Sequence, residues 1–310
     1  MISKCKKQSR WQVFYHRALV KIILFIICFI LAKSFSEDKT KGFTFMAIDR
    51  DIPYDPILNS VSDFIDSDKI LSQPFKFLDR GGQSYVFISQ DQKTVIKFFK
   101  KQYNISDGLI QAIDSFLPAS LKKYRFEFLK TRQERFYPIF KSFKIAAEHI
   151  KDETGIIYLH LNPTKDLPFL EVVDNLGISH KLNLNTTSFL IQRRAERIFS
   201  KMEERLASHD VEGAKQLIHN IFEYIYKRSQ KGICDTDNGL KRNYGYIDDK
   251  AISLDVGSFV FDESLKDPLI YRAELERKTK QLGKWLAEVH PELVPYFEEE
   301  LQACLSKSNA

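Results

Sequence analysis

The sequence is poor in the residues that build disulfide frameworks and zinc sites. Four cysteines occur in 310 residues, and none of them forms a CxxC pair. Two of the four, Cys5 and Cys28, lie near the N-terminus. The seven histidines show neither an HExxH motif nor another paired ligand spacing. We therefore expect neither a disulfide scaffold nor a zinc centre.

The main part of the chain also lacks an excess of positive charge. The formal net charge is +6, but seven lysines and arginines precede Glu37, the first acidic residue, so the rest of the chain is close to neutral. A near-neutral body offers no electrostatic case for nucleic-acid binding. The 44% hydrophobic and 28% charged residues are typical of a globular protein, and 310 residues fit one two-lobed domain or two small domains.

One long hydrophobic run lies near the N-terminus. A basic segment over residues 1–17 precedes an apolar segment over 18–35, in which 22–32 is uninterrupted. This run is shorter than the about 20 residues of a bilayer span. A signal-peptide core fits it, and so does an anchor that begins near Ala18 with Lys21 reaching the interface. We favour a single N-terminal membrane anchor, because no clear cleavage site follows; secretion after signal cleavage is the alternative.

The folded part is expected to begin near Pro74, after a tether over residues 36–74. Alternating apolar and polar positions over 75–100 predict a three-stranded meander, with Gly81 and Gly82 in its first turn. Adjacent glycines let the backbone approach a ligand and leave N–H groups for phosphate oxygens, although a plain hairpin is the alternative. In the apolar third strand, Lys97 needs an anionic partner or water.

Helical and strand patterns follow along the rest of the chain. Residues 105–150 are helical in pattern and carry three candidate partners for Lys97, namely Glu127, Glu134 and Glu148. Short strand patterns occupy 155–191, including a hairpin with its turn at 174–177. From Ala195 the pattern is helical, with apolar residues at helical spacing over 217–225.

The stretch from Lys231 to Phe259 concentrates polar side chains that can carry chemistry. Short apolar runs alternate there with Asn, Gly and Asp turns, which predicts a β-hairpin flanked by carboxylates. Such a hairpin would bring Asp237, Asn243 and Asp255 together. Oxygen ligands without Cys or His suit Mg²⁺ better than zinc. A calcium loop fails because Tyr246 stands where its bidentate glutamate is required. A turn cap at Asp237 and a solvent-exposed carboxylate at Asp255 are the structural alternatives.

In their order along the chain, these pieces resemble the protein-kinase-like fold over residues 75–262. Gly81-Gly82-Gln-Ser-Tyr-Val stands where that family has its Gly-rich loop, and VIKFF places Lys97 where it has a lysine on the third strand. The resemblance implies an α+β, two-lobed fold. Its N-lobe, an antiparallel sheet plus helix, would cover 75–192, and a short, mostly helical C-lobe would cover 193–310.

The resemblance extends to the stretch from Lys231 to Phe259, which we call the acidic stretch. KGICDTD is similar to the run that contains the family's HRD, which places Asp237 at the catalytic aspartate and Asn243 at the metal-binding asparagine. Asp255-Val-Gly stands for DFG. Several departures accompany this match: Asp235 replaces the histidine, Val256 replaces the phenylalanine, the loop has one extra residue, and no APE-like triplet follows. They favour the atypical and small-molecule branches of the family.

The resemblance implies a phosphotransferase that uses ATP and Mg²⁺, and the apolar segment over 18–35 adds a membrane anchor to it. Lys97 would neutralise the α- and β-phosphates and be held by a helix glutamate, for which Glu148 is the first choice and Glu134 the second, while Gly81 and Gly82 would approach the nucleotide. The metal would be bound by Asn243 and Asp255. The role of Asp237 would be to accept or orient the hydroxyl proton of an unidentified protein or small-molecule acceptor. The alternative is a pseudokinase that serves as a membrane-tethered binding or scaffold protein; an anchored α+β domain without a nucleotide site is the third possibility.

Overall fold

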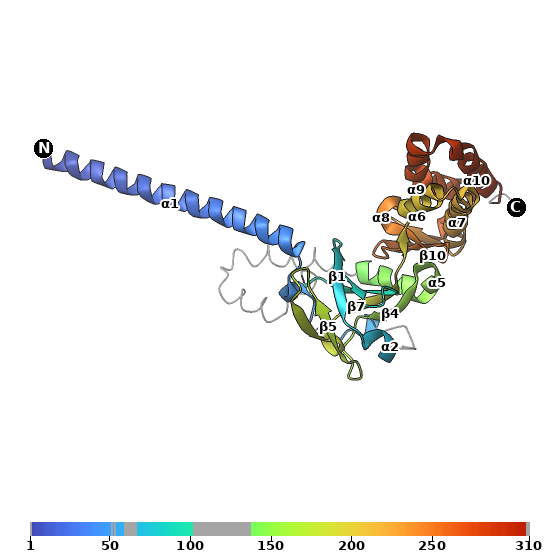
Figure 1. Cartoon of the computed structure of the whole chain (residues 1–310), viewed down its shortest axis with the longest axis horizontal. Coiled ribbons are helices and arrows are strands. Elements are labelled where there is room, and N and C mark those ends of the chain that lie inside the picture. Colours follow the sequence, from blue (N-terminus) through green and yellow to red (C-terminus); the bar gives the residue numbers. More distant parts are fainter. Residues whose placement is uncertain (1, 51, 53, 59–66, 102–137, 308–310) are drawn as a thin grey trace.

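A computed structural model describes residues 2–50, 52, 54–58, 67–101 and 138–307. In Figure 1, a long N-terminal helix, α1 (Ile2–Thr40), projects from a body made of a sheet part and a helical part. The segment Phe14–Thr40 is long and apolar enough to cross a membrane, and none of its most apolar window is buried. The protein is thus an α+β body behind an exposed apolar helix.

The sheet part contains a seven-stranded sheet in the order β4-β7-β3-β2-β1-β5-β6 among the described residues. Neighbouring strands are antiparallel except β1 and β5, which are parallel. The predicted meander over 75–100 is present as β1, β2 and β3, and the turn predicted at 174–177 joins β5 to β6. The bounds are β1 (Phe75–Arg80), β2 (Ser84–Ser89), β3 (Thr94–Phe99), β4 (Ile156–His160), β5 (Phe169–Val173), β6 (Ser179–Asn183) and β7 (Phe189–Arg193).

Alternation along β3 decides which face of the sheet carries Lys97. Ile96 and Phe98 belong to an aromatic core on one face, whereas Phe99 packs against a helix over residues 138–149 on the other. Because successive strand residues point to opposite faces, Lys97 lies on the same face as Phe99. That face is turned toward the helix and the acidic stretch.

Part of the segment expected to be a tether is packed into the sheet part. Phe43 and Ile48 are buried in the aromatic core, where η1 (Phe45–Ala47) lies between them, and Ile48 forms a β-bridge with Lys100. Residues 67–71 form α2 (Ser67–Leu71), whose Leu71 is buried, and η2 (Pro56–Leu58) precedes it. The folded body therefore begins before Pro74, because these apolar side chains fill the sheet core.

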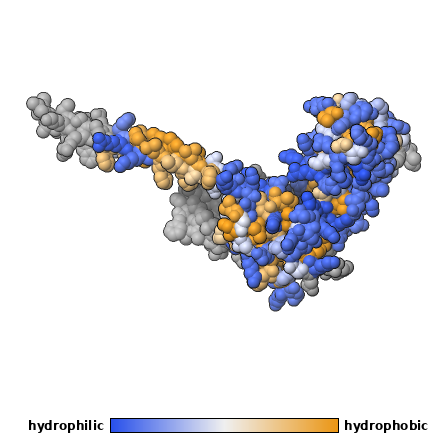
Figure 2. Space-filling view, viewed as in Figure 1, coloured by the Kyte–Doolittle hydropathy of each residue, from blue (hydrophilic) through white to orange (hydrophobic). Residues whose placement is uncertain are grey.

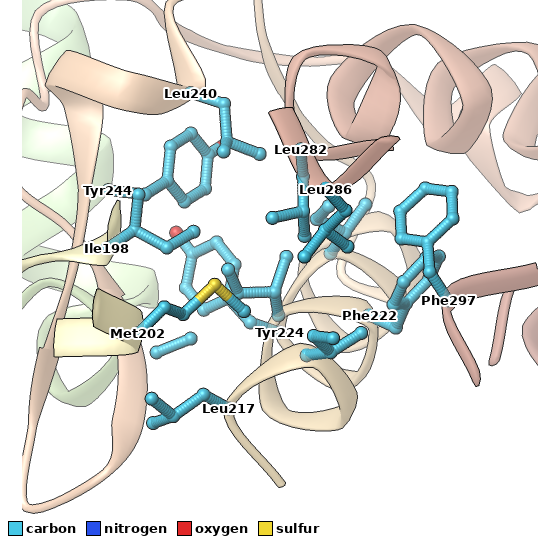
Figure 3. Close-up of a cluster of buried hydrophobic side chains, with 14 of the residues drawn as sticks. Ile198, Met202, Leu217, Phe222, Tyr224, Leu240, Tyr244, Leu282, Leu286 and Phe297 are labelled. Carbon is cyan, nitrogen blue, oxygen red and sulfur yellow. The ribbon is translucent and has the colours of Figure 1, made fainter. Parts of the chain in front are cut away.

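The helical part is built around α7 (Val211–Gln230), whose predicted apolar face is buried. Figure 3 shows this core, to which α7 contributes Leu217 and Phe222 and α9 contributes Leu282 and Leu286. The cap of α7 is Asp210, whose side chain accepts from the Gly213 amide. The other helical elements are α5 (Lys151–Thr154), α6 (Ile198–Ala207), η6 (Glu263–Lys266), α9 (Pro268–Val289), η7 (Pro291–Leu293) and α10 (Val294–Lys307).

The acidic stretch forms short elements at the junction of the two parts. The predicted hairpin is present as β10 (Tyr244–Ile247) and β11 (Lys250–Ser253), and its turn uses Asp248 and Asp249 at positive φ. β8 (Glu196–Arg197) adds a third strand to this hairpin. β9 (Ile233–Asp235) pairs with β12 (Phe259–Phe261), and α8 (Leu240–Asn243) lies between β9 and β10. The β9–β12 pairing brings the two ends of the acidic stretch side by side.

Candidate functional site

The strand lysine and the Asp-Val-Gly segment meet at the junction. Lys97 Nζ donates a hydrogen bond to the Leu254 carbonyl at 2.5 Å, and its charge interacts with the Asp255 carboxylate. Burial lowers the pKa of Lys97, and the charge of Asp255 opposes this shift without cancelling it. The ammonium group of Lys97 and the exposed carboxylate of Asp255, which are far apart in the sequence, therefore lie close together in the fold.

The Asp-Val-Gly segment is held by the helix over 138–149. Val256 is fully buried against this helix, and Ser142 Oγ donates to the Val256 carbonyl at 2.6 Å. The same hydroxyl accepts from the Phe259 amide at 2.5 Å. Asp255 remains exposed, and its carboxylate accepts from the Gly257 amide at 3.1 Å. The valine thus anchors the segment while the carboxylate stays accessible.

The glycine turn between β1 and β2 lies against the same segment. Lys100 Nζ donates to the Gly81 carbonyl at 2.5 Å, and the Lys100 amide donates to the Gln83 carbonyl at 3.0 Å. The Gln83 side-chain amide fills the space beside Gly257, where an added Cβ would overlap it. The glycine turn is therefore joined directly to Gln83, whose side chain contacts Gly257 of the Asp-Val-Gly segment.

Asp237 and Asn243 lie together on the other side of Leu254. An added Cβ at Gly239 would lie 3.2 Å from Asp237 Oδ1 and 3.3 Å from Asn243 Nδ2, so the two side chains are neighbours. The Asn243 amide is the main cause that lowers the pKa of Asp237; burial opposes it, and the Gly239 amide, which donates at 2.8 Å, adds to the lowering. Asp237 is partly exposed and favours its ionised form.

The Leu254 peptide connects the two groups. Its amide donates to the Asn243 carbonyl at 2.6 Å, and its carbonyl accepts from Lys97. One peptide unit therefore fixes Asn243, Lys97 and Asp255 relative to one another. The structure brings these residues and Asp237 to one junction.

Asp235, which stands at the histidine position of HRD, is buried with 1% of its surface exposed. Its Oδ1 accepts from Ser258 Oγ at 2.7 Å and from the Asp237 amide at 3.0 Å. Its Oδ2 accepts from Tyr244 Oη at 2.9 Å and lies 3.2 Å from Lys278 Nζ. With both oxygens occupied, this carboxylate orders the loop and is not accessible to a substrate.

Two buried cations compensate Asp235. Arg228 of α7 lies 3.9 Å from Asp235 Oδ2, donates to Tyr244 Oη at 2.6 Å and pairs with Glu274 of α9 at 3.3 Å. Lys278 of α9 also donates to the Asp237 carbonyl. Burial lowers the pKa of Lys278, and Asp235 opposes this shift. We call Arg228, Asp235, Glu274 and Lys278 the buried charge cluster.

The sequence analysis did not select Arg228, Glu274 or Lys278, although a signal existed. Arg228 follows Ile225 by three residues on the apolar face of α7, and Lys278 lies between Leu275 and Leu282 at helical spacing. A charged residue at a core position needs a buried partner of opposite charge. That pattern could have pointed to Asp235 as the partner.

Glu148 does not occupy the position assigned to it. It lies on the exposed side of the helix over 138–149, 3.6 Å from Lys144 Nζ and 3.7 Å from His149 Nε2. The buried face of this helix carries Ser142 and Ala146, so the Glu148 carboxylate faces away from Lys97. The two other candidates, Glu127 and Glu134, lie outside the described residues.

The fit of this site to Mg²⁺ follows from its oxygen donors. No group of three or more His, Cys, Asp or Glu side chains gathers to hold a metal among the residues that the structure describes. Mg²⁺ does not require such a cage, because it keeps several waters and takes other ligands from substrate phosphates. Asp255 offers an exposed carboxylate. The side chain of Asn243 is buried, and the atom that could bind the ion is its Oδ1, because the Nδ2 group is a hydrogen-bond donor. The residues present fit the ion.

The comparisons with known proteins are distant. No protein-family model and no curated protein matches the chain. Among solved structures, the chain is similar to the bifunctional kinase-methyltransferase WbdD, with 16% identity and a TM-score of 0.33 over 73% of this chain and 42% of that chain. The structure of monomeric WbdD is 15% identical, with a TM-score of 0.33 over 73% of this chain and 45% of that chain. WbdD bound to a kinase inhibitor is 16% identical, with a TM-score of 0.33 over 75% of this chain and 45% of that chain. The chain spans less than half the length of these proteins, and the likeness to a kinase structure is a distant one.

Proposed function

We propose that this protein is a membrane-anchored, kinase-like phosphotransferase that uses ATP and Mg²⁺. The observation that carries the proposal is the contact of Lys97 with the Leu254-Asp255 segment. A partly buried cation beside an exposed carboxylate, under a glycine turn, matches the needs of a nucleotide triphosphate with its metal. The apolar helix α1 supports the membrane anchor.

Lys97 is suited to bind phosphate oxygens. An ammonium group has three donors, and only one of them is used by the Leu254 carbonyl. The backbone at Gly81 and Gly82 would approach the phosphates from the other side, with the turn closed by the Gly81 amide, which donates to the Ser84 carbonyl at 2.9 Å. Asp255 and Asn243 would hold Mg²⁺, which when bound neutralises phosphate charge.

Asp237 is the carboxylate that would orient the acceptor hydroxyl and accept its proton. It is partly exposed and its pKa is lowered, whereas Asp235 is buried and has both oxygens engaged. The Asp237 backbone is held by Lys278, so the carboxylate has a defined position. Phosphoryl transfer depends mainly on such positioning and on charge neutralisation.

Binding and turnover measured on matched variants test the proposal. ATP and Mg²⁺ at about 100 times Kd should stabilise the full chain by about 2.7 kcal/mol, seen as a thermal shift. Asp255→Ala should lose the shift. Asp237→Ala should keep it but lose phosphate transfer. Asp166→Ala, which changes an exposed carboxylate before β5, should behave like the parent. A chain that shows no shift with nucleotide refutes the site.

A second function is favoured by two departures from the kinase motifs. Asp235 replaces the histidine of HRD and is buried with both oxygens engaged, and Val256 replaces the phenylalanine of DFG. A kinase fold with these departures would bind a nucleotide without transferring phosphate, and would then act as a membrane-tethered scaffold. ATP-dependent stabilisation combined with no turnover in the parent would favour this alternative.

A further inference from the structure

The end of α1 is fixed to the sheet part and does not act as a loose tether. The helix ends at Thr40, Lys41 and Gly42 follow at positive φ, and the Gly42 amide donates back to the Glu37 carbonyl at 3.0 Å. Tyr85 Oη donates to the Gly42 carbonyl at 3.2 Å. Phe43 then enters the aromatic core, with its ring 5.1–5.5 Å from the rings of Phe77, Tyr85 and Phe87. The direction of α1 is therefore set by packed residues.

The turn between β5 and β6 lies against the same end of α1. Asn175 Nδ2 donates to the Lys39 carbonyl at 2.6 Å. The turn is ordered by Asp174, whose Oδ1 accepts from the Leu176 amide at 2.9 Å and from the Ile178 amide at 3.0 Å. His180 Nε2 lies 2.8 Å from Asp174 Oδ2. A rigid turn therefore stands beside the exit of the apolar helix.

This turn exposes large aliphatic side chains, although turn residues are usually small or polar. Leu176 is 53% exposed and Ile178 is 51% exposed. Leu78 of β1, 49% exposed, is at the same end of the sheet, because Lys76 pairs with Val173 in the parallel β1–β5 register. Figure 2 shows hydrophobic surface on the body close to where α1 joins it. We call Leu78, Leu176 and Ile178 the apolar edge.

The spacing along α1 puts this edge at the height of lipid headgroups. Phe35, the last large apolar residue of α1, precedes Lys39 by four residues, which is about 6 Å of helix. The headgroup region of a bilayer is about 5–8 Å thick on each side of the hydrocarbon core. Lys39 and Lys41 at the helix end suit the phosphate layer.

We infer that the apolar edge rests on the lipid surface of the membrane that α1 crosses, which docks the sheet part on the bilayer in one orientation. This inference rests on the membrane anchoring in the proposed function and is independent of nucleotide binding. A lipid surface is the occupant favoured by the structure, because the edge is continuous with the end of an apolar helix. Aliphatic side chains buried at an interface are stabilised by leaving water.

Photocrosslinking in a bilayer tests the inference with the full chain. The protein is reconstituted in phosphatidylcholine vesicles, with p-benzoylphenylalanine in place of Leu176 or, separately, Ile178. Two positions serve as controls. Phe25, in the middle of the apolar segment, reports on anchoring. Leu269, 79% exposed at the start of α9, is on the helical part, which Figure 1 places across the body from α1.

Irradiation should attach lipid at Leu176 and Ile178 in several-fold higher yield than at Leu269, as read by mass spectrometry. If lipid is attached at Phe25, but the yields at Leu176 and Ile178 do not exceed the yield at Leu269, the docking is overturned and the anchor stands. Crosslinks from the turn to a second copy of the chain also overturn it. Absence of lipid at Phe25 refutes the anchor and the docking together.

Discussion

The buried charge cluster makes a quantitative prediction about Asp235. Its carboxylate is the common partner of Arg228 and Lys278, and all three side chains are buried. Asp235→Ala leaves two cations in the core with only Glu274 to compensate them. Removal of one partner from a buried ion pair typically costs about 3–5 kcal/mol. A domain of this size loses about 2–4 °C of Tm per kcal/mol, so Tm should fall by about 6–20 °C.

Thermal unfolding of the full chain in detergent measures this effect. Asp237→Ala is the matched control, because it removes a neighbouring carboxylate that is partly exposed and that accepts from the Gly239 amide. The control should lose about 0.5–1.5 kcal/mol. Equal small shifts for both variants would refute the buried cluster. A large loss for Asp237→Ala alone would show that the roles of the two aspartates are exchanged.

Three further predictions concern the junction. Ser142→Ala removes the hydroxyl shared by Val256 and Phe259 and should cost about 1–3 kcal/mol, whereas Ser306→Ala, on the exposed surface of α10, should change chemical denaturation little. Gly257→Ala should weaken nucleotide binding measured by calorimetry, because its methyl group displaces the Gln83 amide; addition of Gln83→Ala should restore binding, and a double variant as weak as the single one would contradict this. Burial lowers the pKa of Lys97, and only the charged amine binds phosphate strongly, so nucleotide affinity should fall as pH rises through that lowered value. Calorimetry at a series of alkaline pH values checks this, and an unchanged affinity would show that Lys97 does not bind phosphate.

The sequence predicted the elements whose signal is local. The meander over 75–100 and the hairpin at Asp248 and Asp249 have alternating strands and turn residues, and the apolar spacing of α7 predicts its buried face. The packing of Phe43 could not be predicted in the same way. Phe43 lies in a mixed segment without a clear apolar period, which resembles a linker until the strands of the sheet are brought together around this ring.

For the site, the order of the motifs along the chain predicted which residues match the kinase motif positions, but it could not predict which of their side chains touch. The contact of Lys97 with the Leu254 carbonyl depends on the β3 register and on the position of the β10–β11 hairpin, and both are set by long-range pairing. Glu148 is the candidate closest in sequence to the following strand, as the family's helix glutamate is. Its direction depends on which face of that helix packs on the Asp-Val-Gly segment, and Ser142 and Ala146 occupy that face.

The most direct test of the account uses an acyl-phosphate derivative of ATP, which transfers its acyl group to an amine beside the phosphates. A lysine whose pKa is lowered is a better nucleophile than an exposed lysine. Mass spectrometry of the labelled full chain should find acylation concentrated at Lys97, and excess ATP with Mg²⁺ should suppress it there. Labelling at Lys93 and other exposed lysines, with none at Lys97 and no protection by ATP, would contradict a triphosphate site at this junction.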